Sequence, residues 1–302
     1  MRLACDQPGN IGIHHVMSQV TKASDTDLLG RFREIVSDPL NLLIQRHPLA
    51  GVVQDGLVYL HNGHRVPLEG PTAYYDRFSY ILVINRGVHE PLEEYVFQEL
   101  LKILPQAPIM LELGAYWGHY SMWLKQARPQ ATVHLVEPDA ANLAVGVENF
   151  RRNGYEGHFL QEFVGLGKFG IDAFLRNKEI ARLSLLHADI QGYEGEMLSE
   201  TGEALSRKVI DYVFLSTHSQ ALHGDVRDCL AGYGYRIEVS SDFDNETTSF
   251  DGFVCASSPE VKPLFGSFRT LGRAQIVAAQ PGEVIESLRD KLPPPASRVG
   301  PR

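Results

Sequence analysis

The chain has 302 residues, a formal net charge of −9 at pH 7 and a hydrophobic content of 44%. This length allows one large α/β domain with an extension or two small domains, and the composition is typical of a packed globular protein. The diffuse acidic charge disfavours a nucleic-acid partner, because binding to a phosphate backbone needs a basic surface. Small molecules and proteins remain open as partners.

Cysteine use and hydropathy both favour a cytoplasmic protein. Cys5, Cys229 and Cys255 are far apart and form no CxxC pair, so we expect neither a zinc knuckle nor a disulfide framework. The first residues contain no apolar segment of the kind found in signal peptides. No run approaches the roughly 18 apolar residues of a membrane helix, so no membrane span is expected.

The first 85 residues differ in pattern from the rest of the chain. Apolar residues at helical spacing predict a helix over residues 25–36. Within residues 51–84, short alternating runs are broken by Asp55-Gly56 and Asn62-Gly63, which predict β-hairpins. We interpret residues 1–85 as an α+β accessory segment that forms a lid or a dimerisation surface, and a homodimer is therefore an open prediction.

From about residue 93 onward, predicted strands alternate with predicted helices. We expect strands over residues 109–113, 132–137, 158–164, 184–189, 209–216, 235–240 and 250–256. We expect helices over residues 93–104, 120–127, 140–153, 194–203 and 221–232. This order predicts an α/β fold with a doubly wound, mostly parallel sheet of the Rossmann type. No helix separates the last two strands, so the last strand is expected to be antiparallel.

These patterns divide the chain into three parts. Residues 1–85 form the accessory segment, residues 86–260 form the main domain, and residues 261–302 form a C-terminal extension. The proline-rich end of this extension, residues 293–302, is expected to be disordered.

A glycine-containing loop follows the first strand of the main domain. It reads Glu112-Leu-Gly-Ala-Tyr-Trp-Gly118, in which Gly114 and Gly118 allow a tight turn and close contact between the backbone and a ligand. A dinucleotide site would have the pattern G-x-G-x-x-G, whereas this loop places the bulky Tyr116 and Trp117 between its glycines. The loop therefore suits a cofactor without phosphates, such as S-adenosylmethionine (SAM).

Two carboxylates flank this predicted cofactor site. Glu112 lies just before the turn, where a carboxylate could meet the cationic methionine end of SAM directly or through water. Glu137 ends the second strand and is followed by Pro138, and an acid at this place accepts hydrogen bonds from ribose hydroxyls. We predict that the cofactor contacts Glu112, Gly114, Ala115, Tyr116, Trp117, Gly118, Glu137, Pro138 and Glu90.

Several stretches in the same order resemble the FkbM-type methyltransferases over roughly residues 74–256. They are residues 87–94 (GVHEPLEE), 110–117 (MLELGAYW), 136–139 (VEPD), 186–194 (LHADIQGYE), 214–219 (FLSTHS) and 249–253 (SFDGF). The resemblance implies a Rossmann-like class I methyltransferase that uses SAM, mostly on oxygen atoms of natural products, sugars or lipids. Gln191, where the family usually has an acid, and the Tyr116-Trp117 pair indicate a distinct subgroup.

The reaction is expected at the ends of the fourth and fifth strands. These strands end at Asp189 and close to His218, and neighbouring parallel strands place such ends side by side. Methyl transfer to an alcohol needs aligned reactants and removal of a proton. We predict His218 as the general base, because the pKa of a histidine is ordinarily near neutrality. Asp189 is expected to orient His218, bind the acceptor hydroxyl or hold a cation.

A divalent metal is not favoured, although the residues present would allow one. Asp189 and His218, together with His187 or Glu194, could form an oxygen and nitrogen ligand set. Two histidines would suit zinc, manganese or iron better than magnesium. The alternative for His187 is a buried histidine with a hydrogen-bond partner in the core, and we prefer that interpretation.

Two upstream features allow more than one interpretation. The stretch from residue 87 to residue 94 could contact the cofactor or acceptor through His89, Glu90 and Glu94, or it could be a capped helix start with Pro91 in its first turn. The aromatic residues around Tyr74 and Phe78 could line an acceptor pocket, pack in the core or form a subunit contact.

The sequence thus predicts a SAM-dependent methyltransferase that methylates a hydroxyl of a small-molecule, sugar or natural-product acceptor. One alternative is a non-catalytic SAM-binding module that recognises a partner through residues 1–85. Another is a nucleotide-dependent oxidoreductase on a similar sheet, against which the missing third glycine of the loop argues.

Overall fold

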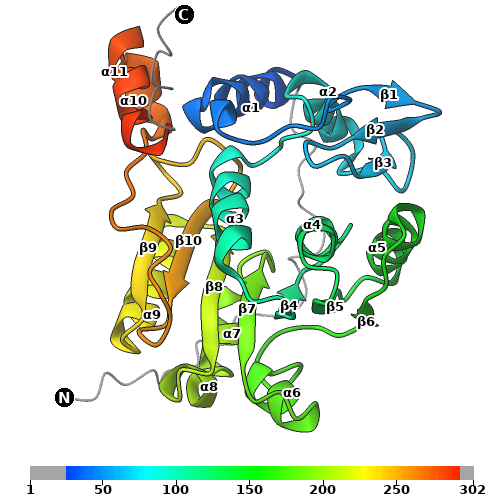
Figure 1. Cartoon of the computed structure of the whole chain (residues 1–302), viewed down its shortest axis with the longest axis vertical. Helices are drawn as coiled ribbons and strands as arrows, with labels where there is room; N and C mark the ends of the chain where they lie inside the picture. Colours follow the sequence, from blue (N-terminus) through cyan, green and yellow to red (C-terminus); the bar gives the residue numbers. More distant parts are fainter. Residues whose placement is uncertain (1–24, 293–302) are drawn as a thin grey trace, which may run out of the picture.

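The computed structural model describes residues 25–292 and contains two β-sheets. The large sheet has seven strands in the order β6-β5-β4-β7-β8-β10-β9 (Figure 1). Its strands are β4 (Ile109–Leu113), β5 (Thr132–Val136), β6 (His158–Leu160), β7 (Leu183–Ala188), β8 (Ile210–Thr217), β9 (Arg236–Ser241) and β10 (Gly252–Ser257). Strand β10 runs antiparallel to both of its neighbours, and the pairs from β6 to β8 are parallel.

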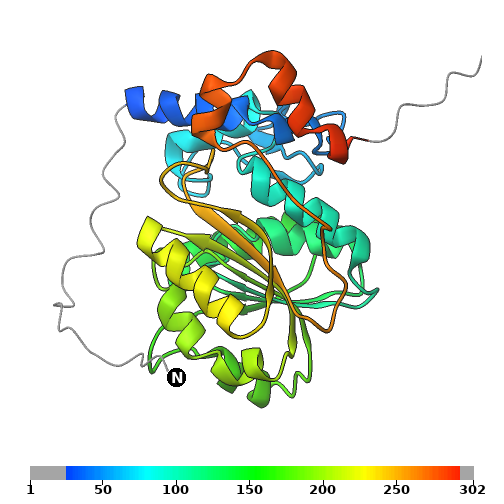
Figure 2. The same ribbon diagram turned by 90° about the vertical axis from the view of Figure 1, so that its left-hand side faces the viewer.

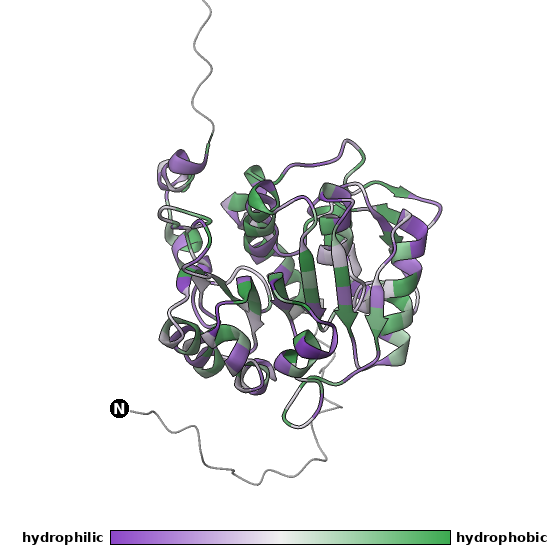
Figure 3. Ribbon diagram, turned by 60° about the horizontal axis from the view of Figure 1, so that its bottom comes forward, coloured by the Kyte–Doolittle hydropathy of each residue, from purple (hydrophilic) through white to green (hydrophobic). Residues whose placement is uncertain are grey.

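This strand order confirms the predicted Rossmann-like class I methyltransferase architecture, including the antiparallel last strand. The central strands β7 and β8 are buried along their whole length, as expected for strands covered on both faces. The hydropathy colouring of Figure 3 places the apolar stretches of the sheet in the middle of the molecule.

Helices cover both faces of the sheet (Figure 2). One face packs against α3 (Pro91–Ile103), α4 (His119–Ala127) and α5 (Ala140–Asn153). The other face packs against α6 (Ile171–Asn177), α7 (Glu194–Ser199), α8 (Gly202–Ser206) and α9 (Gln220–Gly232). Alternation along β4 explains the two cores, because Met110 belongs to the first apolar cluster and Leu111 and Leu113 to the second.

Local sequence explains where these helices begin and end. Pro91 occupies the first turn of α3, where its missing N–H costs no hydrogen bond. The Asp139 side chain accepts hydrogen bonds from the backbone N–H groups of Ala141 and Asn142 and so caps α5. Gly154 ends α5 in the left-handed conformation that glycine adopts without strain.

The accessory segment contains the predicted helix and hairpins. They are α1 (Asp25–Ser37), the 3₁₀ helix η1 (Pro39–Leu42), β1 (Val53–Gln54), β2 (Leu57–Tyr59), β3 (Arg65–Pro67), the 3₁₀ helix η2 (Asp76–Tyr80) and α2 (Ile81–Ile84). The three strands form an antiparallel sheet in the order β1-β2-β3. Figure 1 shows these elements grouped at one end of the large sheet.

Some predicted elements differ from those observed. The expected helix over residues 194–203 is two short helices, α7 and α8, and the strand expected over residues 158–164 ends at Leu160. Helix α6 was not predicted, nor were α10 (Arg273–Ala278), α11 (Pro281–Ser287) and the 3₁₀ helix η3 (Arg289–Lys291) of the C-terminal extension. The proline-rich stretch 293–302 lies outside the described residues. Among the helices described, none combines the length and the apolar character needed to cross a bilayer.

Candidate cofactor and reaction site

The glycine loop between β4 and α4 lies directly against the end of β7. Gly114 and Gly118 have φ angles of 69° and 74°, in the left-handed region. A Cβ atom on Gly114 would lie 1.8 Å from the carbonyl oxygen of Asp189, so no larger residue fits there. The glycine therefore holds the predicted cofactor loop and the predicted reaction residue Asp189 side by side.

Glu137 is bound to this loop through backbone hydrogen bonds. Its Oε2 accepts from the N–H of Tyr116 at 3.2 Å, and its Oε1 accepts from the N–H of Asp139 at 3.1 Å. Burial raises the pKa of Glu137. Oε1 also accepts from the side-chain amide of Asn142 at 3.5 Å, so the remaining acceptor site of Glu137 is on Oε2.

Glu112 is buried beneath the start of α4. Its Oε2 accepts a hydrogen bond from the backbone N–H of Ser121 at 3.2 Å, and only 3% of the residue is exposed. Burial raises the pKa of this carboxyl, and the nearby His187 opposes that shift. Glu112 therefore anchors the helix that follows the glycine loop.

The bulky residues of the loop contact the accessory segment. The Tyr116 hydroxyl donates to the carbonyl of Ala73 at 2.9 Å and accepts from the N–H of Tyr75 at 3.3 Å. Trp117 is 6% exposed and stacks on Tyr74 at 4.5 Å between ring centroids. The aromatic cluster of the accessory segment thus packs over the glycine loop.

Tyr75 lies between the two halves of the predicted site. Although 49% of Tyr75 is exposed, desolvation of its phenol raises the pKa, and the carboxylates of Asp189, Asp251 and Glu137 raise it further. Both Tyr75 and Tyr116 adopt a φ angle of 41°, which is unfavourable for a bulky side chain. Such strain persists only where surrounding contacts hold the backbone in place. Among the other predicted loop contacts, Ala115 is buried and Pro138 is exposed.

His218 lies within a ring of carboxylates at the end of β8. Its Nε2 is 3.0 Å from Asp189 Oδ1 and 3.4 Å from Asp251 Oδ1, and its Nδ1 is 3.0 Å from Glu194 Oε1. These contacts have ion-pair distances, although their angles fall short of hydrogen-bond alignment. The predicted proximity of Asp189 and His218 is therefore present, with two further acids beside them.

This environment changes the pKa on which the general-base prediction for His218 depends. Burial alone would lower the pKa of the imidazole, but Asp189, Glu194 and Asp251 together raise it to about 11. At neutral pH the ring is protonated and has no lone pair that could accept a proton. His218 in turn lowers the pKa of Asp189 against the effect of burial, so the Asp189 carboxylate is ionised.

Three carboxylates from different parts of the chain face one another at this edge of the sheet. Oxygen atoms of Glu90, Asp189 and Asp251 all lie within 4.8 Å of one another. Burial and the charges of Asp189, Glu90 and Glu93 raise the pKa of Asp251 well above its ordinary value, while His218 opposes the shift. Burial raises the pKa of Glu90 to about 7. The side chains remain partly exposed, so a ligand can reach this acidic group.

His187 pairs with Glu93 of α3. Its Nε2 is 2.7 Å from Glu93 Oε1, and the residue is 4% exposed. Its Nδ1 is buried without a hydrogen-bond partner, so the interpretation of His187 as a satisfied core histidine stays a prediction, and Asp189, Glu194 and His218 form a group that could hold a metal ion.

Sequence reasoning missed Glu93 and Asp251. Glu93 also accepts a hydrogen bond from the Ser216 hydroxyl at 3.3 Å, so it bridges α3 to β7 and β8. A signal for Asp251 was present, because it lies at the start of the strand expected to be antiparallel. Such a strand begins at the edge where its parallel neighbours end.

Comparison with known proteins supports a methyltransferase. A family model described as "Methyltransferase FkbM domain" matches residues 168–237, a stretch that includes both Asp189 and His218. No curated protein matches the chain.

Several solved structures resemble this one weakly. TrmK of M. capricolum in complex with S-adenosyl-homocysteine is 13% identical over 65% of this chain and 81% of that chain, with a TM-score of 0.39. Precorrin-6y C5,15-methyltransferase from Geobacter metallireducens GS-15 is 14% identical over 55% of this chain and 86% of that chain, with a TM-score of 0.40. A ribosomal protein L11 methylase from Lactobacillus delbrueckii subsp. bulgaricus is 12% identical over 55% and 79% of the two chains, with a TM-score of 0.40. At these scores the similarities carry no argument about function.

The family match and the fold together support a SAM-dependent methyltransferase, and residues 168–237 match the FkbM methyltransferase domain model.

Proposed function

We propose that this protein transfers a methyl group from SAM to a hydroxyl group of a small-molecule acceptor. The observation that carries this proposal is the group of Glu90, Asp189 and Asp251 beside the glycine loop. Three carboxyl groups this close repel one another when ionised, and a cation among them relieves that repulsion. SAM carries a sulfonium and an ammonium group, so an acidic site beside the loop fits it.

The loop itself also fits a nucleoside cofactor. Gly114 leaves no room for a side chain, so the backbone of the loop and the end of β7 can both approach a ligand closely. Glu137 would accept a hydrogen bond from a ribose hydroxyl at Oε2, and Glu112 would hold α4 in place through Ser121. SAM, when bound, supplies an electrophilic methyl group.

The protonated His218 gives the reaction residues distinct roles. Its positive charge keeps Asp189 ionised, so the Asp189 carboxylate would accept the hydrogen bond of the acceptor hydroxyl and then its proton. Asp251, whose pKa is raised by burial and by Asp189, would contribute a further carboxyl group beside the acceptor.

The acceptor class is a further part of the proposal. An acidic reaction site and a net charge of −9 suit a neutral or cationic small molecule better than a polyanion such as RNA. Natural products and sugars fit this description. Cytoplasmic location and a homodimer stay predictions.

Calorimetric titration of the full chain with S-adenosyl-homocysteine (SAH) and with NAD(H) tests the cofactor. We expect SAH to bind and NAD(H) not to bind. In Glu137→Gln, loss of a charge-assisted hydrogen bond should weaken SAH binding by about tenfold or more. Glu162→Gln, at an exposed position, should bind like the wild type. Binding of NAD(H) without SAH would contradict the proposal and favour an oxidoreductase.

Transfer of a labelled methyl group from SAM to a panel of small-molecule alcohols then tests the reaction. Tight binding of SAH without transfer to any acceptor in a broad extract would favour the non-catalytic binding module instead.

A further inference from the structure

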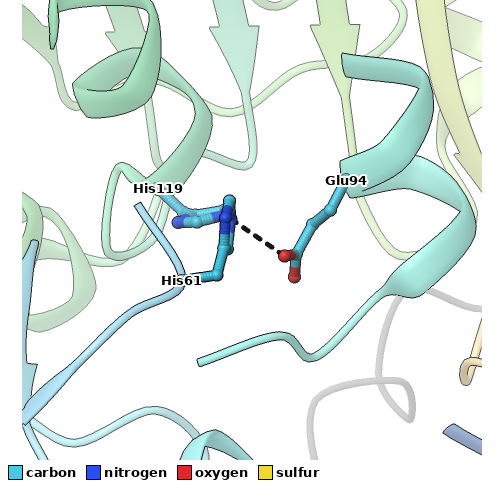
Figure 4. A group of neighbouring side chains, drawn as sticks. All are labelled: His61, Glu94 and His119. Carbon is cyan, nitrogen blue, oxygen red and sulfur yellow. Dashed lines mark ion pairs between the residues drawn. The ribbon is translucent and has the colours of Figure 1, made fainter. Parts of the chain in front are cut away.

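A second group of side chains of the kinds that bind metal ions is formed by residues of the accessory segment, α3 and α4. It consists of His61, between β2 and β3, Glu94 in α3, and His119, the first residue of α4 (Figure 4). One ligand atom of each residue lies within 4.8 Å of the other two. The residues are 1%, 0% and 1% exposed, so this is a buried group.

The polar atoms of this cluster lack hydrogen-bond partners. Both ring nitrogens of His119, both ring nitrogens of His61 and Oε2 of Glu94 are buried without one. His61 Nε2 lies 3.0 Å from Glu94 Oε2, an ion-pair distance without hydrogen-bond alignment. A buried polar atom without a partner destabilises the folded state, so five in one place call for a ligand that satisfies them.

The surroundings orient Glu94 toward the two imidazole rings. Its Oε1 accepts hydrogen bonds from the backbone N–H groups of His89 and Glu90, at 2.8 Å and 3.1 Å. The His89 ring approaches the same oxygen, with Nδ1 at 2.6 Å. Oε1 is therefore satisfied, and Oε2 is the oxygen left to face His61 and His119. Metal sites commonly hold a ligating carboxylate in this way through its second oxygen.

We propose that His61, Glu94 and His119 bind a zinc ion. Two imidazoles and one carboxylate form a ligand set that zinc accepts, whereas magnesium and calcium prefer oxygen atoms alone. Ligand atoms around tetrahedral zinc are about 3.3 Å apart, given bonds of about 2.0 Å, and the His61–Glu94 separation is already close to this value. A small movement of the His119 ring would complete the set.

The position of the site suggests what the ion does. His61 belongs to the accessory segment, Glu94 to the first helix of the main domain, and His119 follows the glycine loop and stacks on Trp117 at 5.2 Å. An ion at this point would join the accessory segment to the helix that follows the cofactor loop. A cavity of about 530 Å³ has His61 and Trp123 in its wall. The inference does not depend on the proposed reaction.

Zinc content of the full chain, purified without a histidine tag, tests this proposal. After loading with zinc and dialysis against metal-free buffer, the wild type should retain about one zinc per chain, and a chelator should lower its melting temperature. Cobalt in place of zinc should give the visible absorption of a tetrahedral site. A folded wild type that retains no zinc and gives no cobalt spectrum would overturn the proposal, whatever the outcome of the SAH titration.

Variants separate this site from adventitious binding. His119→Gln and Glu94→Gln should weaken zinc binding by about 100-fold or more, since even residues that only orient a ligand commonly account for 10–100-fold. His64→Gln is the matched control, because His64 is also buried in the accessory segment but bonds Tyr155. Circular dichroism establishes that each variant is folded. Equal zinc retention in folded His119→Gln and in the control would also overturn the proposal.

Discussion

At the scale of single residues, Gly114 is the position at which the fold restricts the choice of amino acid most strongly. A side chain there would meet the carbonyl of Asp189 and would also need a left-handed backbone. We expect Gly114→Ala to lower the free energy of unfolding by about 3 kcal/mol or more, measured by urea denaturation. Gly154→Ala is the control, since Gly154 is also left-handed but its Cβ would meet nothing within 4 Å. It should cost about 1–2 kcal/mol. Equal losses would show that the close contact with Asp189 is unimportant.

The charge of His218 gives a second prediction at this scale. Its pKa is about 11 in the folded protein, above the value of about 6.5 for an unperturbed histidine. The stability it contributes is therefore complete below about pH 6.5 and is lost as the pH rises toward 11. Between pH 7 and pH 9.5, the melting temperature of the wild type should fall more steeply than that of His218→Gln.

The groups that face His218 are Asp189, Glu194 and Asp251, and all three remain in this variant. His158→Gln, at an exposed position, should keep the slope of the wild type. Parallel slopes for His218→Gln and the wild type would mean that His218 is not held protonated.

At the scale of elements, the contact between the glycine loop and the accessory segment can be tested. Tyr116→Phe removes the hydrogen bonds to Ala73 and from Tyr75. We expect amide hydrogen exchange at residues 73–76 to become about tenfold faster, and SAH to dissociate faster, because two bonds that hold this stretch over the loop are lost. Tyr59→Phe also removes one hydroxyl bond in the accessory segment, to Gln54, and should leave exchange at residues 73–76 unchanged. Unchanged exchange in Tyr116→Phe would show that other contacts hold this stretch.

Elements with strong periodicity were predictable from the sequence, and short ones were not. The apolar runs of β4, β7 and β8 are typical of strands inside a sheet that is covered on both faces. The sequence also contains the residues that cap both ends of α5. Helix α6 has seven residues, too few for a helical pattern to stand out. The pair of Asp189 and His218 followed from the parallel strands that carry them. The protonation of His218 could not be predicted, since Glu194 and Asp251 reach it only in the folded chain.

The candidate zinc site could not be predicted from the sequence either. His61, Glu94 and His119 come from three elements, and no spacing in the sequence relates them. Zinc motifs that can be read from a sequence place their ligands a few residues apart on one element. Here the docking of the accessory segment brings His61 to the other two, so only the structure reveals the group.

At the scale of the whole molecule, the accessory segment and the main domain share one apolar core. Phe32, Val58 and Tyr74 of the accessory segment belong to the same buried cluster as Phe97 and Trp117 of the main domain. We therefore expect one cooperative thermal transition, with a calorimetric enthalpy equal to the van't Hoff enthalpy. Two separate transitions in scanning calorimetry would show that residues 1–85 unfold as an independent domain.

The hydrogen bonds of Tyr116 have a consequence for how such a protein can diversify. Its hydroxyl contacts the carbonyl of Ala73 and the N–H of Tyr75, which are main-chain atoms that nearly every amino acid provides. The hydrogen bonds between Tyr116 and this stretch of backbone therefore do not depend on which side chain occupies position 75. Because half of the Tyr75 side chain faces solvent beside the acidic group, substitution there could change the acceptor without releasing the segment. Position 75 is accordingly the first place to vary in a library selected for new acceptors.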